Sequence, residues 1–459
     1  MTNTAGFTDV ALHLHPQTDP RAHEGRGPLI ITEGDGAWVV DDAGRRYIEG
    51  MAGLWCASLG FNDSRLADVA HRQLGRLATY HTFNHRSNDA CIALVEAISA
   101  LSPIADPHVF LANSGSEAND TMVKMAWYFN AARGRPEKRR IISRQGAFHG
   151  STVMGAALSG LPHMHRTFNL PMTDVLYAEQ PHHRRFARPG ESEDAYSTRL
   201  AEELEALIVN EGADTIGAMI AEPVMGAGGV VIPPAGYFPK VQAVLRRHDI
   251  LLLSDEVICG FGRTGSWFGC ETFGFQPDML GVAKGLSSGA LPIAAVLVSP
   301  RIYETVADEA HRIGTFGHGF TYSGHPVAAA VATEALRIYR EMDVPGVARE
   351  LGAYLRQALD QALASHPLVG EVRSVGFLAG IGLVADPATG REFDPARKVG
   401  ALVERHCLSR GAIVRNMGDA IALCPPYVIA PSEIDLLVER LRGALDDVAD
   451  KVCRESLAA

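Results

Sequence analysis

The sequence predicts a mixed α/β fold, with a mostly parallel, seven-stranded sheet in a large domain and a smaller α+β domain. Short, near-continuous apolar runs alternate with helical patterns over residues 109–299, which is typical of parallel strands covered on both faces. Beyond residue 326, long amphipathic helices surround short strands instead. We therefore expect a large domain over residues 61–325 and a small domain that combines residues 1–60 with residues 326–459.

The expected elements follow in chain order. A hairpin with its turn at residues 42–44 is expected over residues 37–48. The strands of the large sheet are expected at residues 109–113, 140–144, 175–178, 218–222, 251–256, 279–282 and 294–299, with helices at 117–132, 198–209 and 239–247. The polar segment 180–197 is interpreted as a surface excursion. In the C-terminal part, helices are expected at 327–341, 346–364, 395–409 and 433–448, and strands at 372–375, 378–384, 412–415 and 421–423.

The composition excludes some partners. The 459 residues include 42 basic and 53 acidic side chains, a net charge of −11. This balance argues against nucleic acid and anionic membranes as partners, because both are negatively charged. No apolar run approaches the ~18 residues of a membrane-spanning helix, and the N-terminus lacks the pattern of a secretion signal. We therefore expect a cytoplasmic protein.

Neither a metal site nor a disulfide framework is expected. The seven cysteines are odd in number and scattered, without a C-x-x-C pair, which favours reduced thiols. The pairs His163/His165 and His182/His183 have no carboxylate or cysteine partner at ligand spacing, so we interpret them as solvated loop histidines.

Two familiar motifs lack the context that they need. Residues 260–265 match the dinucleotide pattern G-x-G-x-x-G, but no apolar-striped helix follows them. Residues 285–289 match the G-x-S-x-G elbow of serine hydrolases, which would make Ser287 a nucleophile. The following Ala-Leu-Pro does not begin the helix that the elbow requires, so a hydrolase is only a remote alternative.

A stronger signal lies where the first predicted strand of the large sheet ends. Ser114, Gly115 and Ser116 separate this strand from a helix. Small residues let the backbone approach a ligand closely, and the free N–H groups of a helix start favour an anion such as phosphate. A plain helix cap explains the same residues equally well.

Two further signals follow strongly apolar strands. Asp255 and Glu256 end one strand, where a carboxylate is costly unless it faces a cation or hydrogen-bond donors. Lys284 follows another strand and enters a Gly/Ser-rich turn. Desolvation there would lower the pKa of its amine and make it available for a Schiff base.

Together these three signals describe the requirements of pyridoxal phosphate. The cofactor needs an anion site for its phosphate, an acid that keeps its ring nitrogen protonated, and an amine that bonds to its aldehyde. Phe148, in Phe148-His149, offers an aromatic face that could stack on the ring, although ordinary core packing would explain it as well.

At this point the sequence resembles the class III aminotransferases of fold type I over nearly its whole length. The motifs that carry the resemblance are Asn-Ser-Gly-Ser-Glu-Ala-Asn at 113–119, Phe-His-Gly-Ser-Thr at 148–152, Ala-Glu-Pro at 221–223, Ser-Asp-Glu-Val-Ile-Cys-Gly-Phe-Gly-Arg-Thr-Gly at 254–265, Ala-Lys-Gly at 283–285, and Gly-Phe-Thr-Tyr-Ser-Gly-His-Pro at 319–326.

The resemblance implies residue roles. Lys284 would form the Schiff base and shuttle the proton, and Asp255 would pair with the pyridinium nitrogen. The cofactor-binding residues that it implies are Ser114, Gly115, Ser116, Phe148, His149, Glu222, Asp255, Val257, Lys284 and Thr321. Thr321 would reach the phosphate from the partner subunit, so a homodimer with interfacial active sites is implied. A tetramer is left open.

Sequence details favour the pyruvate-dependent ω-transaminase branch. Ile258 stands where the acetylornithine, ornithine and 4-aminobutyrate branches resemble one another in having Gln, and Ser151 stands where acetylornithine enzymes usually have Arg. Residues 50–55 and 413–419 are similar to segments of pyruvate-dependent amine transaminases. The substrate-binding residues that this likeness implies are Leu54, Trp55, Phe83, Phe148, Tyr322 and Arg415. A guanidinium such as that of Arg415 can fork onto a substrate carboxylate.

The expected activity is therefore a ping-pong transamination from a primary amine or ω-amino acid to pyruvate, with pyridoxamine phosphate as the intermediate form of the cofactor. The expected partners are the amine donor and the keto-acid acceptor. A 2-oxoglutarate-dependent aminotransferase and an aminomutase are the alternatives within the same class.

Overall fold

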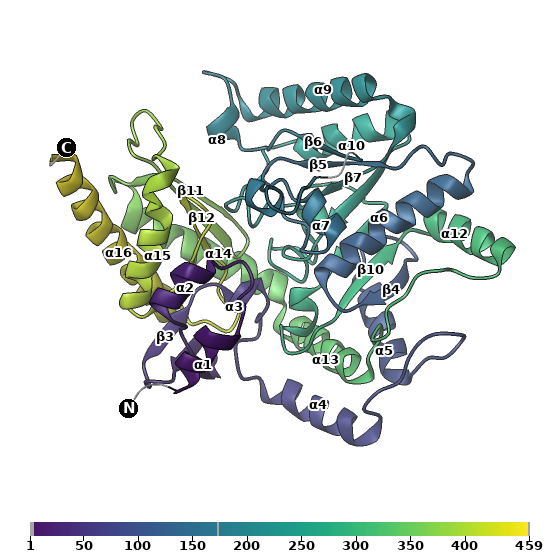
Figure 1. Cartoon of the computed structure of the whole chain (residues 1–459), viewed down its shortest axis with the longest axis horizontal. Coiled ribbons are helices and arrows are strands. Elements are labelled where there is room, and N and C mark those ends of the chain that lie inside the picture. Colours follow the sequence, from purple (N-terminus) through teal and green to yellow (C-terminus); the bar gives the residue numbers. More distant parts are fainter. Residues whose placement is uncertain (1–3, 172–173, 458–459) are drawn as a thin grey trace.

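The computed structural model describes residues 4–171 and 174–457 of the chain. A large body is built on a seven-stranded sheet, and a smaller body contains both chain ends and two four-stranded sheets (Figure 1). The mixed α/β fold with a mostly parallel sheet is thus confirmed. The exact domain boundaries at residues 60 and 325 stay a prediction.

The large sheet has the strand order β4-β10-β9-β8-β7-β5-β6. Its strands are β4 (His108–Ala112), β5 (Arg140–Arg144), β6 (Val175–Ala178), β7 (Ile216–Ala221), β8 (Leu251–Asp255), β9 (Met279–Val282) and β10 (Ala294–Val298). Only β10 runs antiparallel to its neighbours. Every residue of β7, β8, β9 and β10 is buried, which explains why these strands read as unbroken apolar runs.

The register of β8 and β9 brings two sequence signals to one edge of this sheet. Asp255 at the end of β8 pairs with Gly281, three residues before Lys284. Because both strands are parallel, the carboxylate and the amine emerge at the same carboxyl edge, where ligands bind in such sheets.

Helices cover the large sheet (Figure 1). They include α4 (Ser64–Arg76), α5 (Asp89–Ser99), α6 (Gly115–Ala132), α7 (Val153–Leu158), α9 (Glu193–Glu211), α10 (Tyr237–Arg247), α12 (Pro300–Ile313) and α13 (Pro326–Met342). Within the described ranges, no helix combines the length and the apolar character that crossing a bilayer requires. The cytoplasmic location stays a prediction.

The small body joins the two chain ends through hydrogen-bonded strands. Its first sheet contains β1 (Ile31–Asp35), β2 (Trp38–Asp41), β3 (Arg46–Glu49) and β13 (Ala412–Ile413), and β13 pairs in parallel with β3. Its second sheet contains β11 (Val369–Val375), β12 (Leu378–Leu383), β15 (Ala420–Leu423) and β14 (Arg415–Asn416). The helices α14 (Val344–Leu363), α15 (Val399–Ser409) and α16 (Pro431–Leu457) complete it.

Three sequence expectations were wrong in detail. Residues 180–197 are not a simple excursion, because α8 (His183–Phe186) and the first turn of α9 lie within them. Polar residues of this segment stabilise the start of α9. Ser192 caps the helix by accepting from the Ala195 N–H at 3.2 Å, and acidic residues occupy its first turn. The helix expected at 395–409 begins only at Val399, because Lys398 adopts a left-handed φ of 48°. The strand expected at 412–415 is divided between two sheets.

Two helical glycines, one in each body, differ in how tightly their surroundings are packed. A Cβ on Gly352 in α14 would overlap the carbonyl oxygen of Gly376, whereas a Cβ on Gly75 in α4 would meet nothing within 4 Å. We expect Gly352→Ala to lower the free energy of unfolding by about 1–3 kcal/mol, as overpacking does. Gly75→Ala should raise it by about 0.4–1 kcal/mol, because alanine restricts the unfolded chain. Denaturant titrations of both variants check this, and equal effects would contradict it.

Candidate active site

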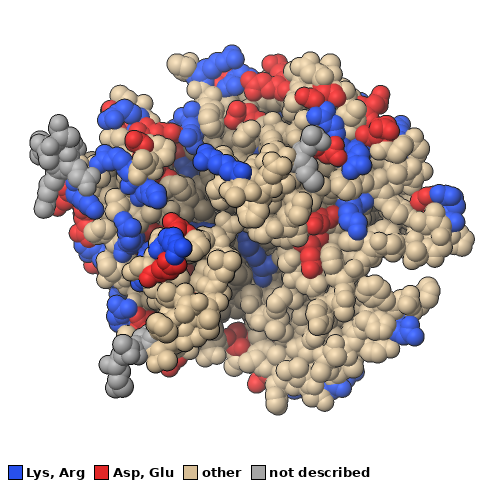
Figure 2. All heavy atoms as spheres, in the orientation of Figure 1, with Lys and Arg blue, Asp and Glu red and all other residues tan. Residues whose placement is uncertain are grey.

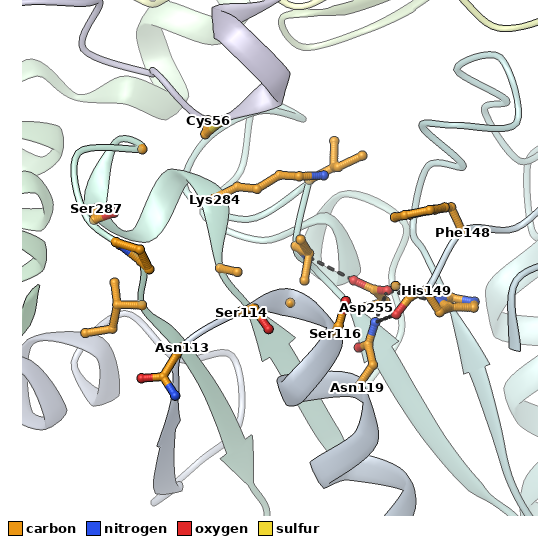
Figure 3. Close-up of a pocket in the computed structure, with 18 of the residues that line it drawn as sticks. Cys56, Asn113, Ser114, Ser116, Asn119, Phe148, His149, Asp255, Lys284 and Ser287 are labelled. Atoms are coloured by element: carbon orange, nitrogen blue, oxygen red, sulfur yellow. Dashed lines mark hydrogen bonds and ion pairs between the residues drawn. The ribbon is translucent and has the colours of Figure 1, made fainter. Parts of the chain in front are cut away.

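A cavity opens at the carboxyl ends of the central strands, beside the start of α6 (Figure 3). On the face shown in Figure 2, the molecule is hollowed between the two bodies. The cavity is lined from the large body by residues that follow β4, β5, β7, β8 and β9: Asn113, Ser114, Gly115, Ser116, Asn119, Phe148, His149, Gly150, Glu222, Asp255, Val257, Ile258, Ala283, Lys284, Ser287, Gly289, Leu291, Pro292 and Ile293. Cys56 lines it from the N-terminal segment.

The carboxylate of Asp255 is buried and held on both oxygens. Its Oδ2 accepts hydrogen bonds from Asn119 Nδ2 at 2.7 Å and from His149 Nδ1 at 2.8 Å, and its Oδ1 accepts from the Val257 N–H at 3.1 Å. These bonds compensate the desolvation of the charge and fix its orientation. Asp255 therefore presents a preoriented negative charge to the cavity.

The amine of Lys284 enters the same cavity from the short helix η3 (Lys284–Ser287). Figure 3 shows its side chain along one side of the pocket, with Asp255, His149 and Asn119 grouped on the other. Lys284 has a φ of 32°, a conformation that a non-glycine residue adopts only where its surroundings enforce it. Burial lowers the pKa of its amine below the ordinary value, although the negative charge of Asp255 opposes the shift.

The start of α6 forms a narrow concave turn. The Ser114 side chain caps the helix by accepting from the Glu117 N–H at 3.2 Å. The N–H groups of Gly115 and Ser116, which both line the cavity, have no partner within the helix. A Cβ on Gly115 would lie 3.0 Å from both methyl carbons of Val257. Ser116 Oγ accepts from the Ser151 N–H at 3.0 Å. The turn thus combines anion-binding geometry with the close packing that glycine permits.

The hydrogen bonds of Glu222 go to the loop that carries Phe148 and to its own loop. Its Oε1 accepts from the Phe148 N–H at 3.1 Å and its Oε2 from the Gly226 N–H at 3.0 Å, so it orders the loop that presents Phe148 to the cavity. Burial raises the pKa of Glu222, and the neighbouring charge of Asp255 acts in the same direction.

Several predicted substrate residues lie outside this cavity. Trp55 is buried in a cluster with Met51, Ile258 and Leu378, and Leu54 beside it is 48% exposed. Phe83, Thr321 and Tyr322 are also exposed in the single chain. Arg415 lies on β14, half-buried and near enough to Lys284 to affect the pKa of that amine. The roles of these residues stay predictions.

The motifs set aside in the sequence do not form the sites that their patterns suggest. Ser287 donates from Oγ to the Leu291 carbonyl oxygen at 2.6 Å, so its hydroxyl is engaged by backbone instead of a general base. Residues 260–265 form a buried turn that is followed by the four-residue helix α11 (Gly269–Thr272). The six described cysteines are free thiols.

Asn119 is the site residue that sequence reasoning missed. Its Nδ2 also donates to the His149 carbonyl oxygen at 2.7 Å, so one amide joins α6, the loop after β5 and the end of β8. A signal for it existed, because Asn119 follows Ser116 by three residues and therefore shares a face of the helix with it.

The donor set fits pyridoxal phosphate. An amine of lowered pKa, a fixed carboxylate, an aromatic ring and a glycine-containing helix start line a single cavity. Ser116 and the α6 start would hold the phosphate, Asp255 the ring nitrogen and Lys284 the aldehyde carbon.

Comparisons with known proteins agree with this arrangement. The model of the family "Aminotransferase class-III" matches residues 21–445. Gamma aminobutyrate transaminase 3 from Solanum lycopersicum is 46% identical over 426 residues, which cover 93% of this chain and 82% of that protein. The omega transaminase from Pseudomonas jessenii in complex with PMP superposes with a TM-score of 0.96 at 47% identity, covering 97% of this chain and 98% of its own.

A second solved structure, a transaminase with L-ala, has a TM-score of 0.90 at 50% identity and covers 92% of this chain and 100% of its own. The relative and both structures cover more than nine tenths of the chain, and the residues that the family model matches include every strand that delivers a residue to the cavity. The chain therefore belongs to the class III aminotransferases, which use pyridoxal phosphate.

Proposed function

We propose that this aminotransferase moves an amino group from a primary amine or an ω-amino acid to pyruvate, which gives alanine. The observation that carries the proposal is the burial of the Arg415 guanidinium without an ion pair. Its guanidinium is half-buried near Lys284, and across residues 4–171 and 174–457 no acidic side chain forms an ion pair with it. The nearby Glu404 carboxylate accepts from the Asn416 side chain instead.

A half-buried cation with no carboxylate in direct contact is costly, because the charge of Glu404 offsets its desolvation only in part, and a substrate carboxylate would relieve the rest. Pyruvate and ω-amino acids each bring one carboxylate. The relatives support this substrate class: one is a gamma aminobutyrate transaminase, and one solved neighbour holds L-alanine, the amino acid formed when pyruvate is aminated.

Bound pyridoxal phosphate supplies an aldehyde carbon that carries the amino group and a ring that accepts electrons. With the cofactor bound, Lys284 Nζ, whose neutral form burial favours, would hold the aldehyde carbon and would move the proton of the donor carbon. Asp255 holds a proton on the ring nitrogen, and Asn119 and His149 hold Asp255 in place. The start of α6 anchors the phosphate.

A homodimer would complete the site. Thr321, Tyr322 and Phe83 are exposed in the single chain and line no part of the cavity, although the family likeness implies that they contact cofactor and substrate. Phe83 also lines a second concavity together with Phe316, Gly319 and Ser323, on the surface next to Thr321. A partner subunit covering this surface would bring Thr321 to the neighbouring cavity.

The dimer is tested by sedimentation equilibrium of the cofactor-loaded enzyme. We expect a particle of twice the chain mass of 49.2 kDa, or a multiple of it. A monomer that remains fully active at dilution would contradict the placement of Thr321 at a partner's cavity.

Replacing Lys284 tests its bond to the cofactor. We expect Lys284→Ala and Lys284→Arg both to abolish the covalent label that borohydride fixes between cofactor and protein, and to abolish transamination. Lys284→Arg is the sharper variant, because it keeps the positive charge while a guanidinium cannot give up its proton. Mass spectrometry of the reduced proteins measures the label, and a label that persists in either variant would rule out Lys284 as its site.

Replacing Arg415 tests the acceptor. Losing a charge-assisted contact to a carboxylate costs about 1.5–3 kcal/mol, so Arg415→Ala should lower kcat/KM for pyruvate roughly 10- to 150-fold. The half-reaction with benzylamine, which has no carboxylate, should change far less. Stopped-flow measurement of each half-reaction separates the two effects.

The matched control is Arg405→Ala, which removes an exposed arginine from the neighbouring helix α15. It should leave both half-reactions unchanged. Equal losses with pyruvate and benzylamine in Arg415→Ala would remove the carboxylate role. A parallel series with 2-oxoglutarate distinguishes the acceptors, and faster turnover with it than with pyruvate would overturn the choice of pyruvate.

A further inference from the structure

Three histidines contact one carboxylate in the N-terminal segment. The helices of this segment, α1 and α2, lie on the small body (Figure 1), and its residues do not line the cavity described above. Asp9 lies near the end of α1 (Thr4–Leu12), His13 and His15 lie in the connection that follows, and His23 lies on α2 (Pro20–Arg26). None of these residues takes part in the aminotransferase site. The cluster was also not anticipated from the sequence, because His23 reaches Asp9 only when α2 packs beside α1.

The geometry of the cluster converges on one point. Asp9 Oδ1 lies 2.8 Å from His15 Nε2 and 3.0 Å from His23 Nε2. One ligand atom from each of Asp9, His15 and His23 lies within 4.8 Å of the others. The His15 ring also packs beside the His13 and His23 rings, with centroids 4.1 Å and 4.2 Å away.

The surroundings favour a cation. The side chains of Asp9, His15 and His23 are 23%, 25% and 12% exposed, so they are largely shielded and still reachable from solvent. Glu24 lines the same concavity as His15 and His23, and its carboxylate is paired with Arg21 at 2.8 Å.

We propose that Asp9, His15 and His23 form a binding site for a divalent transition-metal ion of the zinc class. Two imidazole nitrogens and one carboxylate oxygen are ligands that Zn²⁺ prefers, and they leave a fourth position for water. Ca²⁺ and Mg²⁺ do not fit, because they prefer oxygen ligands. Each ring binds through the Nε2 lone pair with its proton on Nδ1, and the metal replaces the two hydrogen bonds to Asp9 Oδ1.

His13 supports the site from outside. Its Nδ1 lies 3.2 Å from Asp9 Oδ2, the oxygen that the metal does not need. Such a carboxylate–histidine contact orients a ligand and tunes its basicity.

The bound ion would fasten α1 to α2. The two helices contain nine and seven residues, and no residue of either is fully buried. Helices this short are marginal in water without tertiary contacts. An ion held by ligands from both helices would therefore order the segment that precedes β1.

The test uses the untagged, cofactor-loaded enzyme after treatment with a chelating resin. We expect equilibrium dialysis against ZnCl₂, followed by elemental analysis, to find one tightly bound zinc per chain. Asp9→Asn and His15→Ala/His23→Ala should each weaken binding at least about tenfold, since even the loss of an outer partner costs that much. The double variant His71→Ala/His163→Ala, which removes two exposed histidines elsewhere, should bind as the parent does.

Limited proteolysis provides a second measurement, which does not depend on the number of zinc ions bound per chain. Arg21 and Arg26 are exposed on α2 and are sites for trypsin. Zinc should slow cleavage after them in the parent and in the control variant, but not in His15→Ala/His23→Ala. Absence of tight zinc in the parent, or equal binding by all variants, would overturn the proposal and leave the cluster as a hydrogen-bonded helix connection.

Discussion

The buried carboxylate of Asp255 is the constraint around which the site is arranged. A buried charge is tolerated only when hydrogen bonds replace the water that it has lost. The donors that replace it come from three elements: Asn119 from α6, His149 from the loop after β5, and the Val257 N–H from the turn after β8. These three elements must therefore meet at one edge of the sheet. The start of α6 and the loop that carries Phe148 belong to two of them, so both are placed at the same edge.

The same carboxylate governs the amine across the cavity. Burial favours the neutral form of Lys284, whereas Asp255 and Glu222 favour its charged form. Together these effects lower the pKa of the amine from its ordinary value. A lowered pKa suits a group that must both bond to carbon and carry a proton. Arg415 approaches from the small body and shifts the balance further toward the neutral amine.

A second buried network joins the two bodies behind the site. Arg263, in the turn after β8, donates to the Pro425 carbonyl oxygen at 2.6 Å and to Ser58 Oγ at 3.2 Å, so a residue of the large body binds both ends of the small one. Nearby, Glu256 accepts from the Gly269 and Cys270 N–H groups, and burial raises its pKa to about 7. Because Arg263 binds the chain that follows β15, the strand paired with β14, its bonds help to place Arg415 on β14 relative to Lys284 in η3.

The amino-acid sequence by itself determined the strand pattern of the large sheet, the family, and the positions of Lys284, Asp255 and the turn at Ser114–Ser116, because strand ends, apolar runs and turn residues are local signals. It did not reveal Asn119 as a partner of Asp255, the division of residues 412–416 between two sheets, or the cluster around Asp9. The first two features depend on contacts between residues far apart in the chain, and the cluster around Asp9 is completed by His23 only when α1 and α2 pack together. Tertiary structure likewise decided that Trp55 is buried and that Thr321 faces outward, since exposure is a property of the folded surface.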